Sequence, residues 1–226
     1  MALILSLETS TDICSVALHN DGNLLSVQES VDDFSHSKNI TIFIENCLKE
    51  AFKSINELDA VAVSIGPGSY TGLRIGLSIA KGICYGLKTP LIAINSLDIL
   101  AQASQESNMD LVFAMIDARR MEVYASIYDN SLGTLVQTHS MIISEKSFEQ
   151  YKDKIIYFCG NGYSKALPYL DDVKAIKGTE QTSAKLMGKI AFYEYTQKKY
   201  KNIFTISPDY FKEPNITKSK KNIIQL

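Results

Sequence analysis

Short runs of apolar residues near the start of the chain predict a series of buried strands. One run covers residues 3–7, and a second covers residues 13–18 after a turn rich in Ser and Thr. Residues 20–23 read NDGN, which is a strong turn signal, and a third strand is predicted over residues 24–28. The pattern therefore indicates a three-stranded meander.

Longer segments with helical spacing follow the meander. Apolar residues recur at three- and four-residue steps over residues 36–53, and a second helix is predicted over 72–87. Buried strands are predicted at 59–65 and 91–94, and a short helix at 96–103. This order of elements predicts a mixed sheet with helices packed on it.

The second half of the chain begins in the same way as the first. Residues 111–117 align with the opening strand, so that Asp117 corresponds to Glu8, and residues 156–163 align with residues 62–69. The matched segments lie closer together in the second copy, which predicts a reduced first helix there. We therefore predict a duplicated unit.

Two similar lobes that each open with a strand ending in an acidic residue predict the α/β fold class. The expected architecture is a duplicated actin-like (RNase H-like) fold, the ASKHA fold, with two mixed-sheet lobes and packed helices. A polar stretch at 104–110 suggests the division. We place an N-terminal lobe with partner-binding helices at 1–104 and a smaller, degenerate C-terminal lobe at 105–226.

The composition limits the class of protein. The 226 residues are 46% hydrophobic, which is enough for a sizeable core, and the net charge of −2 argues against a surface that wraps nucleic acid unaided. The four cysteines lie far apart in apolar contexts and are expected in the core. No signal peptide or membrane-spanning run is recognisable, so we expect a cytoplasmic protein without a membrane partner.

Two turns that follow strands are candidates for phosphate binding. Glu8, Thr9 and Ser10 offer a carboxylate and hydroxyls at the first turn, as in actin-like phosphotransferases. In the second turn Asp117 precedes two arginines, whose bulk prevents a close approach of backbone to phosphate. We therefore predict degenerate phosphate-loop positions at these four residues, no catalytic residue and no cofactor.

Other catalytic classes have less support in the sequence. It has three histidines without an HExxH pair, no GxSxG elbow and no P-loop lysine, so no metal site is predicted. Two alternatives to a non-catalytic protein stay open: an autonomous actin-like ATPase or small-molecule kinase, and a peptidase.

The segment 66–82 is the most specific part of the chain. Gly72, Gly76, Ala80 and Cys84 are spaced four residues apart, so they form a smooth ridge along one helix face. Apolar or small residues surround this helix almost completely, which exceeds what a half-buried helix needs. The excess predicts a second helix-packing surface for a partner.

Several motifs resemble those of the TsaB (YeaZ) family and together span nearly the whole chain. They read GPGSYTGLRIG, LETST, HS, DARRMEVY and PDYFK, at residues 66–76, 7–11, 36–37, 117–124 and 208–212. The resemblance implies a non-catalytic subunit that pairs with a TsaD-type catalytic subunit and a TsaE-type ATPase. That machinery transfers threonylcarbamoyl to the adenosine next to the anticodon in tRNA, so tRNA contact is expected through the complex.

The resemblance also implies where the partner binds. In this family the first two helices form a bundle with those of the partner, and a homodimer uses the same face when the partner is absent. We therefore expect an interface formed by Ile40, Ile44, Cys47, Leu73, Gly76, Leu77, Ala80 and Cys84. If that face points outward, Gly76→Arg or Ala80→Arg should abolish pairing and leave the fold intact.

Overall fold

The structure is a computed structural model that describes residues 1–30, 36–104 and 108–212, apart from the side chains of residues 36–38. The predicted lobe boundary falls on residues 105–107, which lie outside this description. The side chains of the predicted HS motif at 36–37 also lie outside it, as does the tail from residue 213 onward.

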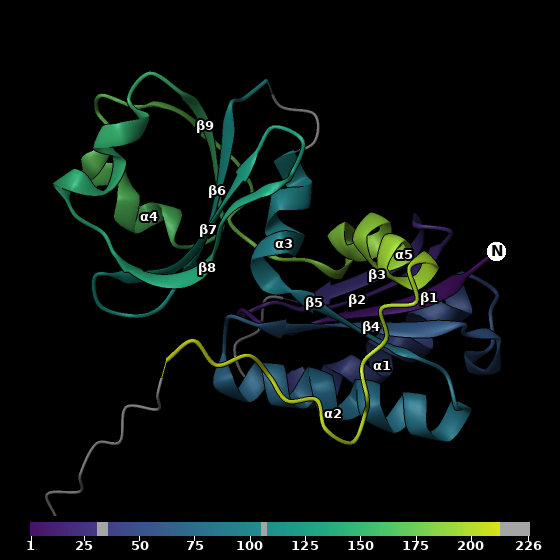
Figure 1. Cartoon of the computed structure of the whole chain (residues 1–226). Helices are drawn as coiled ribbons and strands as arrows, with labels where there is room; N and C mark the ends of the chain where they lie inside the picture. Colours follow the sequence, from purple (N-terminus) through teal and green to yellow (C-terminus); the bar gives the residue numbers. More distant parts are fainter. Residues whose placement is uncertain (31–35, 105–107, 213–226) are drawn as a thin grey trace, which may run out of the picture.

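The first lobe is built on a five-stranded mixed sheet (Figure 1). Its order is β3-β2-β1-β4-β5, in which β1, β2 and β3 are antiparallel and β1, β4 and β5 are parallel. The predicted meander and the two later strands are confirmed. The strands are β1 (Leu3–Glu8), β2 (Cys14–Asn20), β3 (Asn23–Ser30), β4 (Ala60–Gly66) and β5 (Leu91–Asn95).

The second lobe repeats this topology in a second five-stranded sheet. Its order is β10-β9-β6-β7-β8, so each strand has a counterpart five places earlier in the chain. The antiparallel and parallel pairs also recur, which agrees with the predicted duplication. The strands are β6 (Leu111–Asp117), β7 (Glu122–Asp129), β8 (Thr134–Ile142), β9 (Ile155–Cys159) and β10 (Lys174–Lys177).

The helices differ in size between the two lobes. Two long helices, α1 (His36–Glu50) and α2 (Tyr70–Leu87), cover one face of the first sheet. Their counterparts in the second lobe, η3 (Glu145–Tyr151) and α4 (Tyr163–Ala166), are both short, although the sequence predicted a reduction only for the first. The connecting helix α3 (Ser96–Ala101) continues into η2 (Gln102–Ser104) and packs on the second sheet. The remaining short turns are η1 (Ile55–Glu57) and η4 (Leu167–Tyr169).

The last helical segment returns to the first sheet. The turn η5 (Ala184–Met187) leads into α5 (Gly188–Thr196), and its apolar side chains pack on the sheet face opposite α1 and α2 (Figure 1). Ala184, Met187 and Ala191 cover Ile4 and Ala17 there. The sequence placed this segment in the second lobe and predicted no helix in it. Because its buried residues are few and mostly small, its apolar stripe is weak in the sequence.

His19 joins this returning segment to the sheet. The imidazole is buried, lies 3.2 Å from Ser6 Oγ and 3.4 Å from the carbonyl oxygen of Lys185, and burial lowers its pKa to about 4. The unfolded chain therefore binds a proton that the folded protein excludes. We expect the free energy of unfolding to fall by about 2 kcal/mol between pH 7 and pH 5 through this residue.

Urea unfolding at several pH values checks this expectation. His19→Gln should remove most of the dependence between pH 7 and pH 5, whereas His139→Gln, at a half-buried position of β8, should leave it unchanged. A dependence that is equally steep in the His19 variant would contradict this explanation.

Candidate functional site

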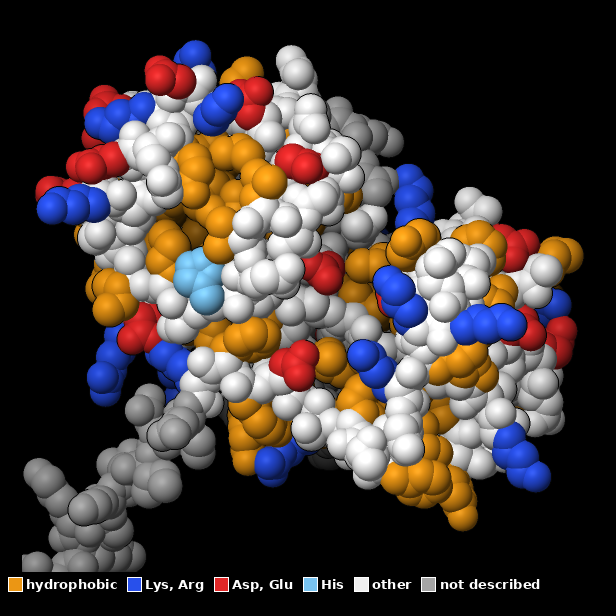
Figure 2. Space-filling model, in the orientation of Figure 1, with side chains coloured by type: hydrophobic (Ala, Val, Ile, Leu, Met, Phe, Trp, Pro, Cys, Tyr) orange, Lys and Arg blue, Asp and Glu red, His pale blue; other side chains and the backbone are white. Residues whose placement is uncertain are grey.

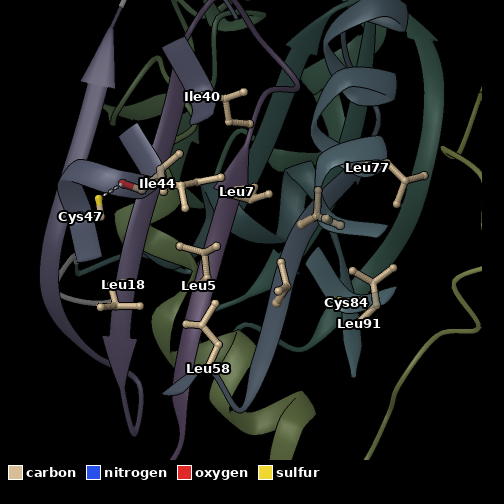
Figure 3. Close-up of a cluster of buried hydrophobic side chains, with 14 of the residues drawn as sticks. Leu5, Leu7, Leu18, Ile40, Ile44, Cys47, Leu58, Leu77, Cys84 and Leu91 are labelled. Carbon is tan, nitrogen blue, oxygen red and sulfur yellow. Dashed lines mark hydrogen bonds between the residues drawn. The ribbon is translucent and has the colours of Figure 1, made fainter. Parts of the chain in front are cut away.

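The eight residues predicted to form the partner interface lie in the core of the first lobe. Figure 3 shows Ile40, Ile44 and Cys47 of α1 and Leu77 and Cys84 of α2 directed at the strands. All eight are buried, and Cys47 Sγ donates to the Val16 carbonyl at 3.3 Å. These side chains pack within the lobe itself, so the ridge that they form is not the exposed surface that the sequence suggested, and their contact with a partner stays a prediction. They are Ile40, Ile44, Cys47, Leu73, Gly76, Leu77, Ala80 and Cys84.

The glycine ridge of α2 faces the first turn of the chain. A Cβ at Gly72 would lie 2.1 Å from the carbonyl oxygen of Thr9, and one at Gly76 would lie 2.3 Å from Thr9 Oγ1. That hydroxyl donates to the Gly72 carbonyl at 2.8 Å. The ridge therefore points inward, so the condition under which Gly76→Arg would leave the fold intact is not met, and this substitution would disrupt the fold.

An apolar groove of about 580 Å³ opens on the other side, between α1 and α2. Its walls combine isoleucine and leucine side chains with a rim of Glu45, Lys49 and Lys53. Of the eight predicted residues, Ile44 also lines it. The remaining wall residues were not among those predicted from the sequence, namely Thr41, Leu48, Ile55, Ile79 and Ile83.

Small exposed residues extend from the groove along the same side of α2. Ser78, Gly82 and Gly86 are exposed and spaced four residues apart, and a Cβ added at either glycine would meet nothing within 4 Å. Ile42 on α1 and Tyr85 on α2 are also exposed, at 53% and 68%. The outer face therefore offers apolar area together with room for a close helix approach. We call the groove and these residues the outer face.

A second hollow of about 750 Å³ lies between the two lobes, where both predicted phosphate turns meet. Ser10 and Asp117 line it from opposite lobes, together with Asp12, Arg119 and Asn161. We call it the interlobe cleft. The structure therefore brings together the two turns that the sequence marked, although Glu8 and Thr9 lie beneath the surface.

The first turn is closed by its own hydrogen bonds. Glu8 is fully buried and accepts from the Ser10 amide at 2.6 Å and from Ser64 Oγ at 3.0 Å, and burial raises its pKa. The Ser10 carbonyl accepts from the Ser69 amide at 2.6 Å. A Cβ at Gly68 would lie 2.1 Å from that same carbonyl oxygen, so the glycine permits this contact. The carboxylate is consequently not presented to the cleft.

In the second turn the Asp117 carboxylate is paired with a lysine and is therefore not available to hold a metal ion. Asp117 Oδ1 accepts from Lys165 Nζ at 2.6 Å and from the Arg119 amide at 2.5 Å. Arg119 and Arg120 both adopt left-handed backbone angles, with φ of 68° and 52°. A turn of two arginines in this conformation lacks the small residues that allow backbone amides to surround a phosphate.

Residues 200–212, which we call the strap, run along α2 and end in the cleft (Figure 1). The Asp209 amide donates to the Ile65 carbonyl at 2.8 Å, and the Tyr210 ring stacks on Tyr70 with centroids 4.9 Å apart. Tyr210 Oη also accepts from Arg74 Nε at 2.8 Å. The motif PDYFK thus contributes to the wall of the cleft, a position that the sequence did not reveal.

Two further findings concern metals and membranes. Within the described ranges, no group of three or more His, Cys, Asp or Glu side chains is placed to hold a metal ion. In the same part of the chain, no helix is both long and apolar enough to span a membrane. All four cysteines are buried, as predicted, and none of them is part of a disulfide.

Comparisons with known proteins identify the family. The TsaD family model, described as tRNA N6-adenosine threonylcarbamoyltransferase, matches residues 31–183, which is more than half of the chain. The tRNA threonylcarbamoyladenosine biosynthesis protein TsaB from Haemophilus influenzae is 32% identical, over 92% of this chain and 93% of that protein.

Solved structures of similar fold support the same family. YeaZ from Pseudomonas aeruginosa has a TM-score of 0.76 and 25% identity, covering 93% of this chain and all of that one. The activator of 2-hydroxyisocaproyl-CoA dehydratase from Clostridium difficile, with bound ADPNP, has a TM-score of 0.51 at 9% identity, over 89% of this chain and 98% of that one. The fold is thus the duplicated actin-like fold, and the chain belongs to the TsaB (YeaZ) family of tRNA threonylcarbamoyladenosine biosynthesis proteins.

Proposed function

We propose that this chain is a non-catalytic subunit of a cytoplasmic tRNA threonylcarbamoyltransferase. In this proposal its outer face pairs with a TsaD-type catalytic subunit, and a TsaE-type ATPase joins the pair. The observation that carries the proposal is the outer face itself, an apolar groove on two long helices that their own lobe leaves uncovered.

The family match supports a partner of related structure. The TsaD family model covers residues 31–183, a range that includes α1 and α2. A related catalytic subunit would bring equivalent helices, so that two similar helix pairs meet about a two-fold axis. The same geometry would allow a second copy of this chain to occupy the outer face when the catalytic subunit is absent.

The cleft supports a non-catalytic role. Phosphoryl transfer depends on acidic groups that hold metal and on amides that hold phosphate. Here Glu8 is buried, Asp117 is paired with Lys165, and the strap occupies part of the wall. These features favour a supporting subunit over the alternative of an autonomous actin-like ATPase or small-molecule kinase.

Reconstitution with a TsaD-type and a TsaE-type protein tests the proposal. We expect threonylcarbamoylation of tRNA to require this chain, and light scattering to detect a stable complex with the TsaD-type subunit. The isolated chain should hydrolyse no ATP above buffer. Activity that is independent of this chain, with no complex, would reject the proposal, and ATP turnover by the isolated chain would favour the kinase alternative.

A further inference from the structure

A row of lysines and an exposed tyrosine runs along the outer side of η5 and α5. Lys185, Lys189 and Tyr193 are spaced four residues apart, so they lie on successive turns of the same side. Lys199 Nζ lies 5.3 Å from the centroid of the Tyr193 ring, which extends the row beyond the helix end. We call these four residues the lysine ridge.

The charge of this segment differs from that of the rest of the chain. Residues 185–201 contain five lysines and one glutamate, whereas the whole chain has a net charge of −2. All five lysines are exposed, and Tyr193 is 56% exposed. In Figure 2, Lys or Arg side chains and apolar side chains lie next to one another over the position of α5. Positive charge is therefore concentrated on a protein that is otherwise acidic.

Among the described residues, two partly exposed carboxylates pair with lysines of the ridge. Glu194 pairs with Lys199 at 3.0 Å, and Glu29 pairs with Lys185 at 3.7 Å. Because exposed ion pairs contribute little free energy, a denser row of negative charges can displace these carboxylates from the lysines. An exposed aromatic ring beside lysines also provides a stacking surface for an unpaired base.

The ridge and the outer face lie on opposite sides of the first sheet. Helices α1 and α2 cover one side, and α5 covers the other (Figure 1). A subunit that binds the outer face would therefore leave the ridge accessible. The ridge can act in the assembled enzyme and can be altered without changing the pairing surface.

We propose that the lysine ridge binds the sugar–phosphate backbone of the tRNA substrate, with Tyr193 stacking on an exposed base. This inference rests on the proposed function, since it assigns to this subunit a direct contact with the RNA. The family resemblance implied tRNA contact through the complex, and the slightly negative overall charge argued against a surface that wraps nucleic acid unaided. The lysines clustered on α5 and on the turn after it can bind phosphate groups, although the net charge of the whole chain is negative.

The test measures binding of an unmodified tRNA transcript to the complex with the TsaD-type subunit over a series of salt concentrations. The double variant Lys189→Glu with Lys199→Glu should lower affinity about tenfold near 0.1 M salt and make the salt dependence shallower by one to two ions, at about one per lost phosphate contact. Tyr193→Ala should lower affinity about fivefold and leave the salt dependence unchanged, because it removes stacking but no charge.

A matched control is available in the second lobe. Lys154→Glu with Lys174→Glu changes the net charge equally, at two exposed positions away from α5, and should leave tRNA affinity within about twofold of the parent. Equal losses in the control and ridge variants would overturn the proposal. So would a ridge variant that loses only binding to phosphatidylserine vesicles, which would indicate a membrane surface.

Complex formation separates this inference from the proposed function. Light scattering should find the ridge variants fully paired with the TsaD-type subunit. If the ridge variants form a normal complex and its tRNA affinity and salt dependence equal those of the parent, the proposal that the lysine ridge binds tRNA is overturned. If no complex forms even with the parent protein, the proposed function fails. The same tRNA titration on the isolated chain then tests the lysine ridge. Loss of salt-dependent tRNA binding in the ridge variant supports the proposal, and equal binding by variant and parent overturns it.

Discussion

Gly82→Arg is expected to abolish pairing with the TsaD-type subunit and, with it, threonylcarbamoylation, while the subunit stays folded. Gly82 lies on the exposed side of α2, where an added side chain meets nothing within the chain. In the complex, the same arginine would enter a helix interface without a counter-ion. An unpaired buried charge costs about 3–5 kcal/mol, which corresponds to a loss of affinity of about 100-fold or more.

Light scattering and the tRNA modification assay measure this effect together, and two variants serve as controls. Gly82→Ala adds only a methyl group in open space and should retain pairing. Leu135→Arg places the same charge at an exposed apolar position of β8 in the second lobe, so it should also pair normally. Normal pairing by Gly82→Arg would show that the partner binds elsewhere.

The sequence indicated this helix as the interface but not which side of it. In α2 both sides are apolar or small, because Gly72, Gly76 and Ala80 alternate with Ile75, Ile79 and Ile83 around the helix. Periodicity shows which residues share a side, and it does not show which side turns inward. The inward side is chosen by the turn at Thr9, whose carbonyl fits only against a glycine, and that contact joins residues far apart in the chain.

The difference between local sequence patterns and contacts between distant residues also explains which parts of the fold and of the cleft were predictable. The strands of the first lobe and the duplication were predictable because they depend on local apolar runs and on similarity between the halves. The return of α5 to the first sheet was not, because it depends on Ala184 and Ala191 meeting Ile4 from the other end of the chain. Likewise Glu8 and Asp117 hold matching positions in the repeat, yet one is buried and the other is paired with Lys165.

Gly72→Ala is expected to have the largest effect on stability of any single methyl addition in α2. The new Cβ would lie 2.1 Å from the Thr9 carbonyl oxygen, a backbone atom, so either the first turn or the helix must move. Movement would also strain the bond from Thr9 Oγ1 to the Gly72 carbonyl. Forcing a methyl group into such a contact should lower the free energy of unfolding by about 3 kcal/mol.

Gly82→Ala provides the opposite case on the same helix. Its methyl group enters open space, and alanine favours the helix over glycine, so the free energy of unfolding should rise by about 0.5–1 kcal/mol. Urea unfolding of the two variants beside the parent protein measures both effects. A loss below about 1 kcal/mol in Gly72→Ala would mean that the first turn yields easily. Since that turn borders the interlobe cleft, such a result would also weaken the inference that its packing keeps the Glu8 carboxylate out of the cleft.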